Sequence, residues 1–225
     1  MNTKNATPPR QRRKEARPQE LLDAALQLFV EKGFAATRSE EVAARAGVAK
    51  GTLYLYYPSK EDLLKAVVRE NLSALIAEGA TIAGSFEGTT QELLVLLMKT
   101  WWARVGNTPA SGIFKIIITE MGNFPDFARF YVQEVIEPGQ DLFTRVLERG
   151  IASGELRQVD VFETVHVLIF PMLMMCLHRH SLGACAAMPS MLDPESFIET
   201  HVDVVVHGLL ARGDEPAKKP RKRAP

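Results

Sequence analysis

Cysteine is scarce in this 225-residue chain, which contains only Cys176 and Cys185. Two cysteines are too few for the disulfide framework of a small secreted domain, and no apolar stretch follows Met1 to act as a secretory leader. The longest apolar run, residues 165–177, contains a histidine and a proline and is far shorter than the roughly 20 residues that cross a bilayer. These absences predict a cytoplasmic protein without a membrane-spanning segment.

Net charge is also absent, because 27 Lys and Arg residues balance 27 Asp and Glu residues. The charges are nevertheless unevenly placed: residues 1–65 hold 12 basic against 8 acidic residues, residues 66–213 hold 10 against 17, and residues 214–225 hold 5 against 2. A basic N-terminal third joined to an acidic body suits a protein that places one end on nucleic-acid phosphates and keeps the other end away from them. Random scatter of charge is the alternative.

Strand-like alternation and glycine-rich phosphate loops are missing too, whereas helical periodicity recurs along the whole body. The pattern therefore predicts an all-α protein. Helices are expected at residues 18–32, in a fourth segment that starts after Ser59 and ends near Gly79 or Gly84, and at 91–105, 113–121, 126–136, 140–152, 161–182 and 194–211. Pro138-Gly139 is expected to kink or break a helix, and Pro171 lies inside the most apolar one.

Composition divides the chain into four segments. Residues 1–17 are rich in Pro, Arg and Lys and are expected to form a disordered basic arm, and residues 213–225 a similar tail. Such arms can lie along a DNA minor groove, and a solvated charged tail is the alternative. Residues 18–65 form one predicted domain and residues 66–212 a second, helical one.

The most informative stretch is 43–57, which predicts two short helices that cross at a glycine turn. Gly47 suits the left-handed backbone that ends the first helix, and it was also expected to leave room where the two helices touch. Val48 and Leu53 supply apolar contacts at the crossing. Upstream, Thr37 and Glu40 have the spacing of a capping box for the first of these helices, and downstream Ser59 is expected to cap the next helix. This is a helix-turn-helix, whose second helix reads DNA.

The flanks of this motif carry a resemblance to a known family. They supply Gly33-Phe34, Ala46-Gly47-Val48, Gly51-Thr52-Leu53-Tyr54, Tyr56-Tyr57, Ser59-Lys60-Glu61 and Leu63-Leu64. Over residues 18–65 the chain closely resembles the TetR family of transcriptional regulators, and beyond them it resembles the family in length and helical character. Two positions depart from the family pattern: Ala49 stands where Ser or Thr is usual, and Arg38 stands where a phosphate-contacting threonine is usual.

The resemblance and the position of the reading helix together predict the DNA-contacting residues. Side chains at the start of that helix point at base edges, and Gly51 lets the backbone approach phosphate. Leu53 is assigned to the core, and Tyr57 is expected to pack inward. The predicted contacts with double-stranded operator DNA are Arg38, Lys50, Gly51, Thr52, Tyr54, Leu55, Tyr56 and Lys60.

Aromatic and methionine residues on the later helices form a second candidate set. Core packing is the default for each, but as a set they could line an apolar pocket for a small apolar or aromatic effector. The predicted lining is Trp101, Trp102, Phe114, Ile117, Met121, Phe124, Phe127, Tyr131, Met172, Met175 and Cys176. Neither a cofactor nor a metal is expected, because in Cys176-x-His178-x-His180 only Cys176 and His180 have helical chelating spacing.

Two helices at the end of the chain, residues 161–182 and 194–211, are apolar on more than one side. With little chain left to cover them, the expected cover is the same pair of helices from a second subunit, in a four-helix bundle about a two-fold axis. A two-fold protein needs a palindromic operator. The resulting hypothesis is a ligand-responsive transcriptional repressor. A DNA-organising protein without an effector is the first alternative, and a helical enzyme the second, although no catalytic motif supports it.

Overall fold

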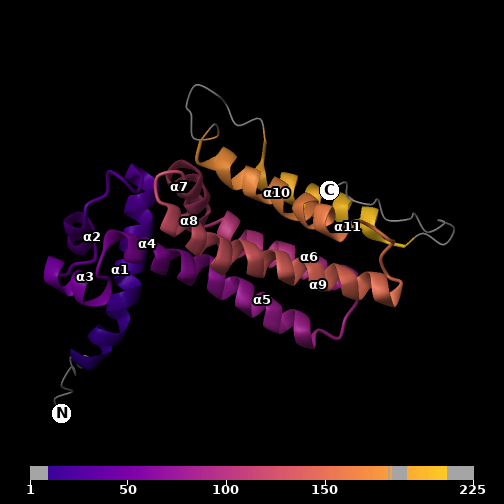
Figure 1. The fold of residues 1–225 in the computed structure, drawn as a ribbon, viewed down its shortest axis with the longest axis horizontal. Coiled ribbons are helices and arrows are strands. Elements are labelled where there is room, and N and C mark those ends of the chain that lie inside the picture. The colour runs from indigo at the N-terminus through magenta and orange to yellow at the C-terminus, as the bar shows by residue number, and fades with distance from the viewer. Residues whose placement is uncertain (1–9, 182, 184–191, 212–225) are drawn as a thin grey trace, which may run out of the picture. The chain divides into compact units, whose positions relative to one another are not determined.

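The computed structural model describes residues 10–181, 183 and 192–211, with side chains from Arg17 onward. Two compact units divide the chain, Met1–Val68 and Arg69–Pro225. Every regular element in the described part is helical, and an isolated bridge between Leu156 and Leu210 is the extended pairing recorded there (Figure 1). The all-α prediction is confirmed. Predictions for Cys185 and for the 213–225 tail lie outside the described residues.

The first unit contains four helices: α1 (Arg10–Lys32), α2 (Ser39–Arg45), α3 (Lys50–Tyr56) and α4 (Lys60–Val68). Their apolar faces meet in a small core with Leu21, Phe29, Leu53 and Leu63 almost fully buried. The helix predicted from Pro18 begins eight residues earlier, so residues 10–17 of the predicted disordered arm are helical. Arg, Lys, Glu and Ala favour helix, and this local preference outweighs Pro18, which lies inside α1.

Helix caps were predicted with mixed success. Ser59 caps α4 as expected, because its Oγ accepts a hydrogen bond from the Asp62 backbone N–H at 2.9 Å. The capping box predicted from Thr37 and Glu40 is wrong by one residue, since the backbone N–H of Arg38 donates to Glu41 at 3.2 Å and α2 starts at Ser39. Thr37 is buried instead, and its hydroxyl donates to the carbonyls of Leu28 and Gly33 at the end of α1.

Gly47 has the predicted left-handed backbone, with φ of 67°. The second reason given for this glycine is wrong, because a Cβ built at Gly47 meets no atom within 4 Å. The turn between α2 and α3 therefore requires glycine for its backbone conformation and not for space.

The second unit is a helical body in which long helices lie side by side (Figure 1). Its α-helices are α5 (Ala74–Ser85), α6 (Thr90–Trp101), α7 (Ile113–Glu120), α8 (Pro125–Tyr131), α9 (Glu137–Ser153), α10 (Val161–Arg179) and α11 (Pro194–Leu209). Helix α9 packs against α5, α6 and α10, and α11 packs against α6 and α10. A short 3-10 helix, η3 (Pro109–Gly112), precedes α7.

Three π-helical turns join some of these helices: η1 (Arg69–Ser73), η2 (Trp102–Gly106) and η4 (Val132–Ile136). The break predicted at Pro138-Gly139 does not occur, because Pro138 lies at the start of α9, directly after η4. Proline lacks an N–H and is tolerated in the first turn of a helix, and a π turn changes the hydrogen-bonding register just ahead of it. Helices α8 and α9 therefore run on through η4.

Helix α10 leaves a large apolar surface uncovered. Phe162, Val167, Phe170 and Met174 are about half exposed or more, and so is Val204 on α11. Within the described residues, α10 is the one helix with the length and apolar composition of a membrane span, a property that core helices of soluble proteins share. It packs against α9 and α11 along its other side.

Candidate DNA-reading face and effector cavity

Helix α3 presents an exposed surface that is unusually rich in large side chains. Tyr54, Leu55 and Tyr56 have 41%, 84% and 38% of their surface exposed, whereas Leu53 is fully buried and fixes the helix on the core. A Cβ built at Gly51 meets nothing within 4 Å, so this edge of the helix is open. The arrangement leaves the predicted base-reading residues on one accessible helix.

Lys50, at the first position of α3, is engaged by Glu40, for which the sequence predicted only a role in capping α2. Its ammonium group forms an ion pair with the exposed carboxylate of Glu40 on α2 and lies 5.7 Å from the centre of the Tyr54 ring. The hydrogen bond from Lys50 holds the pKa of Glu40 below its usual value, and Glu40 raises the pKa of Lys50. Both groups are charged at neutral pH, so DNA must compete with Glu40 for Lys50.

Lys60 is placed differently from the phosphate contact that was predicted. Its ammonium group donates to the backbone carbonyls of Phe34, Ala35 and Thr37 at 2.8, 3.2 and 3.1 Å. It also lies 4.4 Å from the centre of the Phe34 ring, within range of a cation–π interaction. The three N–H groups of the ammonium match the three carbonyls in number. Lys60 therefore links the turn between α1 and α2 to the start of α4. Arg38, by contrast, is exposed, and Thr52 is half-buried on α3.

The second unit contains an apolar cavity of about 400 Å³. It is lined by residues of α5, α6, α9 and α10, with Phe114 from α7 and Tyr131 from α8. Four of the eleven predicted lining residues belong to it: Trp101, Phe114, Tyr131 and Met172.

The other seven predicted residues lie outside this lining. They are Trp102, Ile117, Met121, Phe124, Phe127, Met175 and Cys176. Trp102 shows the reason: at η2 it faces away from the cavity and covers Gly106, where a Cβ would lie 2.0 Å from its ring. Helices α5 and α9 were not among the predicted walls, and they contribute residues that include Ile76, Gly79, Gly139, Gln140 and Phe143. In the sequence these two helices show only helical periodicity, and this pattern is the same for a helix that lines a cavity and for one that packs in a core.

Polar groups are few in the cavity. Gln140 and His166 approach each other at 3.2 Å between their Nε2 atoms, and the His166 Nδ1 is 2.7 Å from the Phe162 carbonyl. The two ring nitrogens of His166 therefore both have hydrogen-bond partners, one on α9 and one on α10 itself. Burial raises the pKa of Tyr131 above its usual value, so its hydroxyl stays protonated. The cavity thus offers a largely apolar wall with a few hydrogen-bonding groups and one carboxylate, that of Glu78, which forms an ion pair with Arg104.

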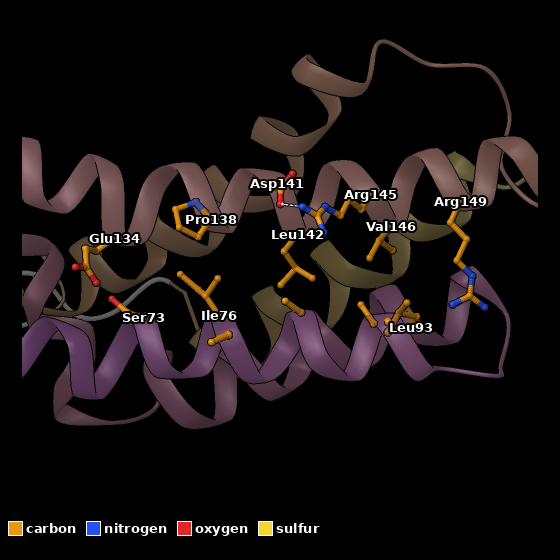
Figure 2. Close-up of a pocket in the computed structure, with 14 residues that line it drawn as sticks. Ser73, Ile76, Leu93, Glu134, Pro138, Asp141, Leu142, Arg145, Val146 and Arg149 are labelled. Carbon is orange, nitrogen blue, oxygen red and sulfur yellow. Dashed lines mark ion pairs between the residues drawn. The ribbon is translucent and has the colours of Figure 1, made fainter.

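Beside this cavity, a groove of about 340 Å³ runs between α5 and α9 (Figure 2). Arg149 closes one end by donating to the carbonyls of Phe86 and Gly88, at 3.0 and 2.6 Å. At the other end Glu134 accepts from Arg69 at 2.8 Å. Two residues, Ile76 and Leu142, line both the groove and the cavity.

Cys176 and His180, the two residues with chelating spacing, each have another environment in the structure. Burial raises the pKa of the Cys176 thiol to about 12, and His180 lies 2.8 Å from the Ser111 hydroxyl through its Nε2. Among the described residues, no group of three or more His, Cys, Asp or Glu side chains is arranged to hold a metal ion.

A helix-turn-helix with an exposed reading helix, followed by a helical body with an apolar cavity, defines a DNA-binding regulator with a separate ligand domain. Comparison with known proteins identifies the family. Residues 21–67 match the family model for bacterial regulatory proteins of the tetR family, and residues 87–193 match the model for the tetracyclin repressor-like C-terminal domain.

Proteins of similar sequence support the same family assignment. The transcriptional repressor KstR2 of Rhodococcus jostii is 31% identical over 150 residues, which are 66% of this chain and 72% of the relative. The fatty acid metabolism regulator protein of Bacillus subtilis is 26% identical over 147 residues, or 64% of this chain and 74% of the relative. The chain belongs to the TetR family of transcriptional regulators. Regulators of this family bind operator DNA, dimerise and bind small molecules.

Solved structures show the same fold. FadR of Bacillus subtilis in complex with stearoyl-CoA has a TM-score of 0.66 at 21% identity, and the match covers 85% of this chain and 98% of that one. The ketosteroid regulator KstR2 of Mycobacterium tuberculosis has a TM-score of 0.65 at 23% identity, with 87% and 96% covered.

Proposed function

We propose that this regulator is a repressor that occupies a palindromic operator as a homodimer and is released by a small molecule with an apolar or aromatic body. The cavity between α5, α6, α9 and α10 carries the proposal. DNA binding alone does not need a space of about 400 Å³ lined mainly by aliphatic and aromatic side chains. The operator lies on the chromosome, so the protein acts in the cytoplasm.

The relatives support an effector of this kind. FadR of Bacillus subtilis forms a complex with stearoyl-CoA, and KstR2 of Mycobacterium tuberculosis is described as a ketosteroid regulator. Both descriptions name a molecule with a large hydrocarbon body. A similar molecule fits the composition of this cavity, whose few polar groups suit a carbonyl or hydroxyl better than a free phosphate.

The uncovered apolar face of α10, together with α11, supports the proposed dimer. Phe170, Met174 and Val204 are 58%, 63% and 62% exposed in the single chain, and large apolar side chains gathered on one surface mark an interaction site. Packing α10 and α11 against the same helices of a second subunit covers this face and gives the two-fold symmetry that a palindromic operator requires.

Release follows if the effector binds more tightly to a dimer whose reading helices do not match the operator half-sites. The difference in effector affinity between the two states is then the free energy that opposes DNA binding. The same relation requires that operator DNA weaken effector binding by an equal factor.

The alternatives have less support. A DNA-organising protein without an effector leaves the cavity unexplained. A helical enzyme would need an activated nucleophile, and Ser111 does not provide one, because it is buried and its hydroxyl donates to the Thr108 carbonyl at 2.7 Å. The nearby His180 therefore acts as a partner of Ser111 and not as its general base.

Operator binding in the presence of candidate effectors tests the proposal. A gel-shift titration with a panel of aromatic and amphipathic molecules should find compounds that weaken operator binding by a factor on the order of ten or more. Ile169→Trp fills the cavity from α10 and should abolish the response while leaving operator affinity unchanged. Ile118→Trp, at a 64% exposed position on α7, is the control and should respond normally. The proposal is wrong if no compound weakens operator binding, or if both variants respond like the parent.

A further inference from the structure

The cavity and the groove are separated by a partition of two side chains. Ile76 extends from α5 toward α9, and Leu142 extends from α9 toward α5, so that each forms part of the wall of both spaces (Figure 2). The groove adds about 340 Å³ to the cavity's 400 Å³. Opening the partition would therefore nearly double the space that one ligand can occupy.

Each half of the partition faces a glycine on the opposite helix. A Cβ built at Gly79 on α5 would lie 3.0 Å from Leu142 Cδ2 and 3.4 Å from Leu97 Cδ2, so Leu142 is seated tightly. A Cβ built at Gly139 on α9 would lie 3.7 Å from Ile76 Cδ1, which is an ordinary contact distance. Gly139 thus leaves free space at the tip of Ile76. Leu142 is the fixed half of the partition and Ile76 the half with room to change rotamer.

We propose that Ile76 and Leu142 set the length of the effector, and that the effector is a linear aliphatic chain whose far end passes between them into the α5–α9 groove. This inference rests on the proposed function. A rotated isoleucine side chain opens a gap about as wide as one hydrocarbon chain, whereas a fused ring system needs the two helices to separate. The groove beyond the gap is elongated along both helices, which also suits a chain (Figure 2).

The volume of the cavity predicts the ligand chain length above which Ile76 must move. A methylene group occupies roughly 25 Å³ in a close-packed interior, so the cavity alone holds a chain of about 16 carbons at most. Shorter chains fit without disturbing Ile76. Longer chains must displace it and enter the groove, where Val146 and Leu93 offer further apolar surface.

The experiment measures binding of a graded series of saturated fatty acids and their coenzyme A thioesters, from octanoyl to arachidoyl, by calorimetry and operator release. Ile76→Ala and Leu142→Ala open the partition and should improve binding of the longest chains by a factor of about ten relative to decanoyl. Gly139→Ala adds a methyl group against Ile76 and should weaken the longest chains by a similar factor without affecting decanoyl. These opposite shifts separate an effect on the partition from general loss of folding.

Two matched variants and one rigid ligand complete the design. Ile118→Ala and Val132→Ala remove apolar side chains from exposed positions outside both linings, so neither should change the preferred chain length. A ketosteroid, which cannot pass the gap, should gain nothing from Ile76→Ala. The proposed role of the partition is refuted if the parent protein binds the fatty-acyl series and no variant at Ile76, Leu142 or Gly139 changes the preferred chain length. If the ketosteroid releases the operator while no chain binds, the chain-length inference fails and the proposed function stands. If no ligand binds or releases the operator, both fail.

Discussion

At the residue scale, Glu40 places a negative charge at the start of the reading helix, where DNA phosphates are expected. Its ion pair with Lys50 also neutralises the first cation of that helix. Glu40→Gln should therefore tighten binding to operator and to unrelated DNA alike, by a factor of about 3 to 10, and increase the slope of log affinity against log salt by about one. Titrations of both DNAs across a range of salt concentrations measure this.

Glu31→Gln is the matched control for Glu40. It removes the same charge from the same unit, but from a carboxylate that pairs with Arg45 at 2.7 Å and lies on α1. If both variants tighten DNA binding equally, the effect comes from the net charge of the unit. If Glu40→Gln weakens operator binding, Glu40 positions Lys50 and does not compete with DNA.

His180 makes the stability of the second unit depend on pH. Burial lowers its pKa below the ordinary value of 6.5, with further contributions from Arg179 and Lys115. The unfolded chain therefore takes up a proton at a higher pH than the folded chain does. The contribution of His180 to the free energy of unfolding is intact above pH 6.5 and is lost as the pH falls from there toward the folded pKa.

His180→Gln replaces the imidazole with an amide that can still hydrogen-bond Ser111 but cannot take up a proton. Its midpoint of urea denaturation should fall less than that of the parent between roughly pH 7.5 and pH 5.5. Equal decreases in the two proteins would show that other groups determine the acid sensitivity.

At the scale of elements, Lys60 joins the α1–α2 turn to α4. Lys60→Met keeps the aliphatic stem but leaves three carbonyl groups without their donor, so it should lower the free energy of unfolding of the N-terminal unit by about 1–3 kcal/mol in the absence of DNA. Lys50→Met removes a lysine from an exposed ion pair and should leave stability nearly unchanged while weakening DNA binding. Thermal denaturation followed by circular dichroism compares them. If Lys60→Met melts like the parent and only DNA binding falls, Lys60 is the phosphate contact that the sequence suggested.

The sequence predicted the helices better than their connections. Regular 3.6-residue periodicity located α1, α3 and the helices from α6 to α11, and Ser59 and Gly47 marked their turns through local chemistry. The cap of α2 was misplaced because Thr37 has two competing uses, and its burial against α1 depends on tertiary contacts. The break expected at Pro138 does not occur, because the π turn η4 directly ahead of it changes the hydrogen-bonding register and lets the helix continue.

The cavity was harder to predict for a related reason. The candidate lining was chosen by residue type, and residue type does not say which side of its helix a residue lies on. Trp101 lies just before η2 and lines the cavity, whereas Trp102 is its first residue and does not. The glycines at positions 79 and 139 have no side chain that would mark a binding wall. Their importance appears only when α5 and α9 are side by side.

At the scale of the whole molecule, the uncovered face of α10 makes dimerisation testable. Met174→Asp places a charge on this face, where burial without a partner costs several kcal/mol, so it should convert the dimer to a monomer and abolish tight operator binding. Ile118→Asp introduces the same charge at an equally exposed position on α7 and should leave a dimer. Light scattering at micromolar concentration gives the masses. A dimeric Met174→Asp protein would place the interface elsewhere.

The two neighbouring tryptophans have a practical consequence. Trp101 lines the cavity with its ring centre 5.8 Å from that of Phe114, while Trp102 is buried away from the cavity against Gly106. A ligand that enters the cavity changes the surroundings of one indole and leaves those of the other unchanged. The protein therefore carries an intrinsic fluorophore that reports occupancy and, at the next position, a second one that serves as its reference. Trp101→Phe would leave the reference emission alone, so the signal of each indole can be separated without attaching a dye.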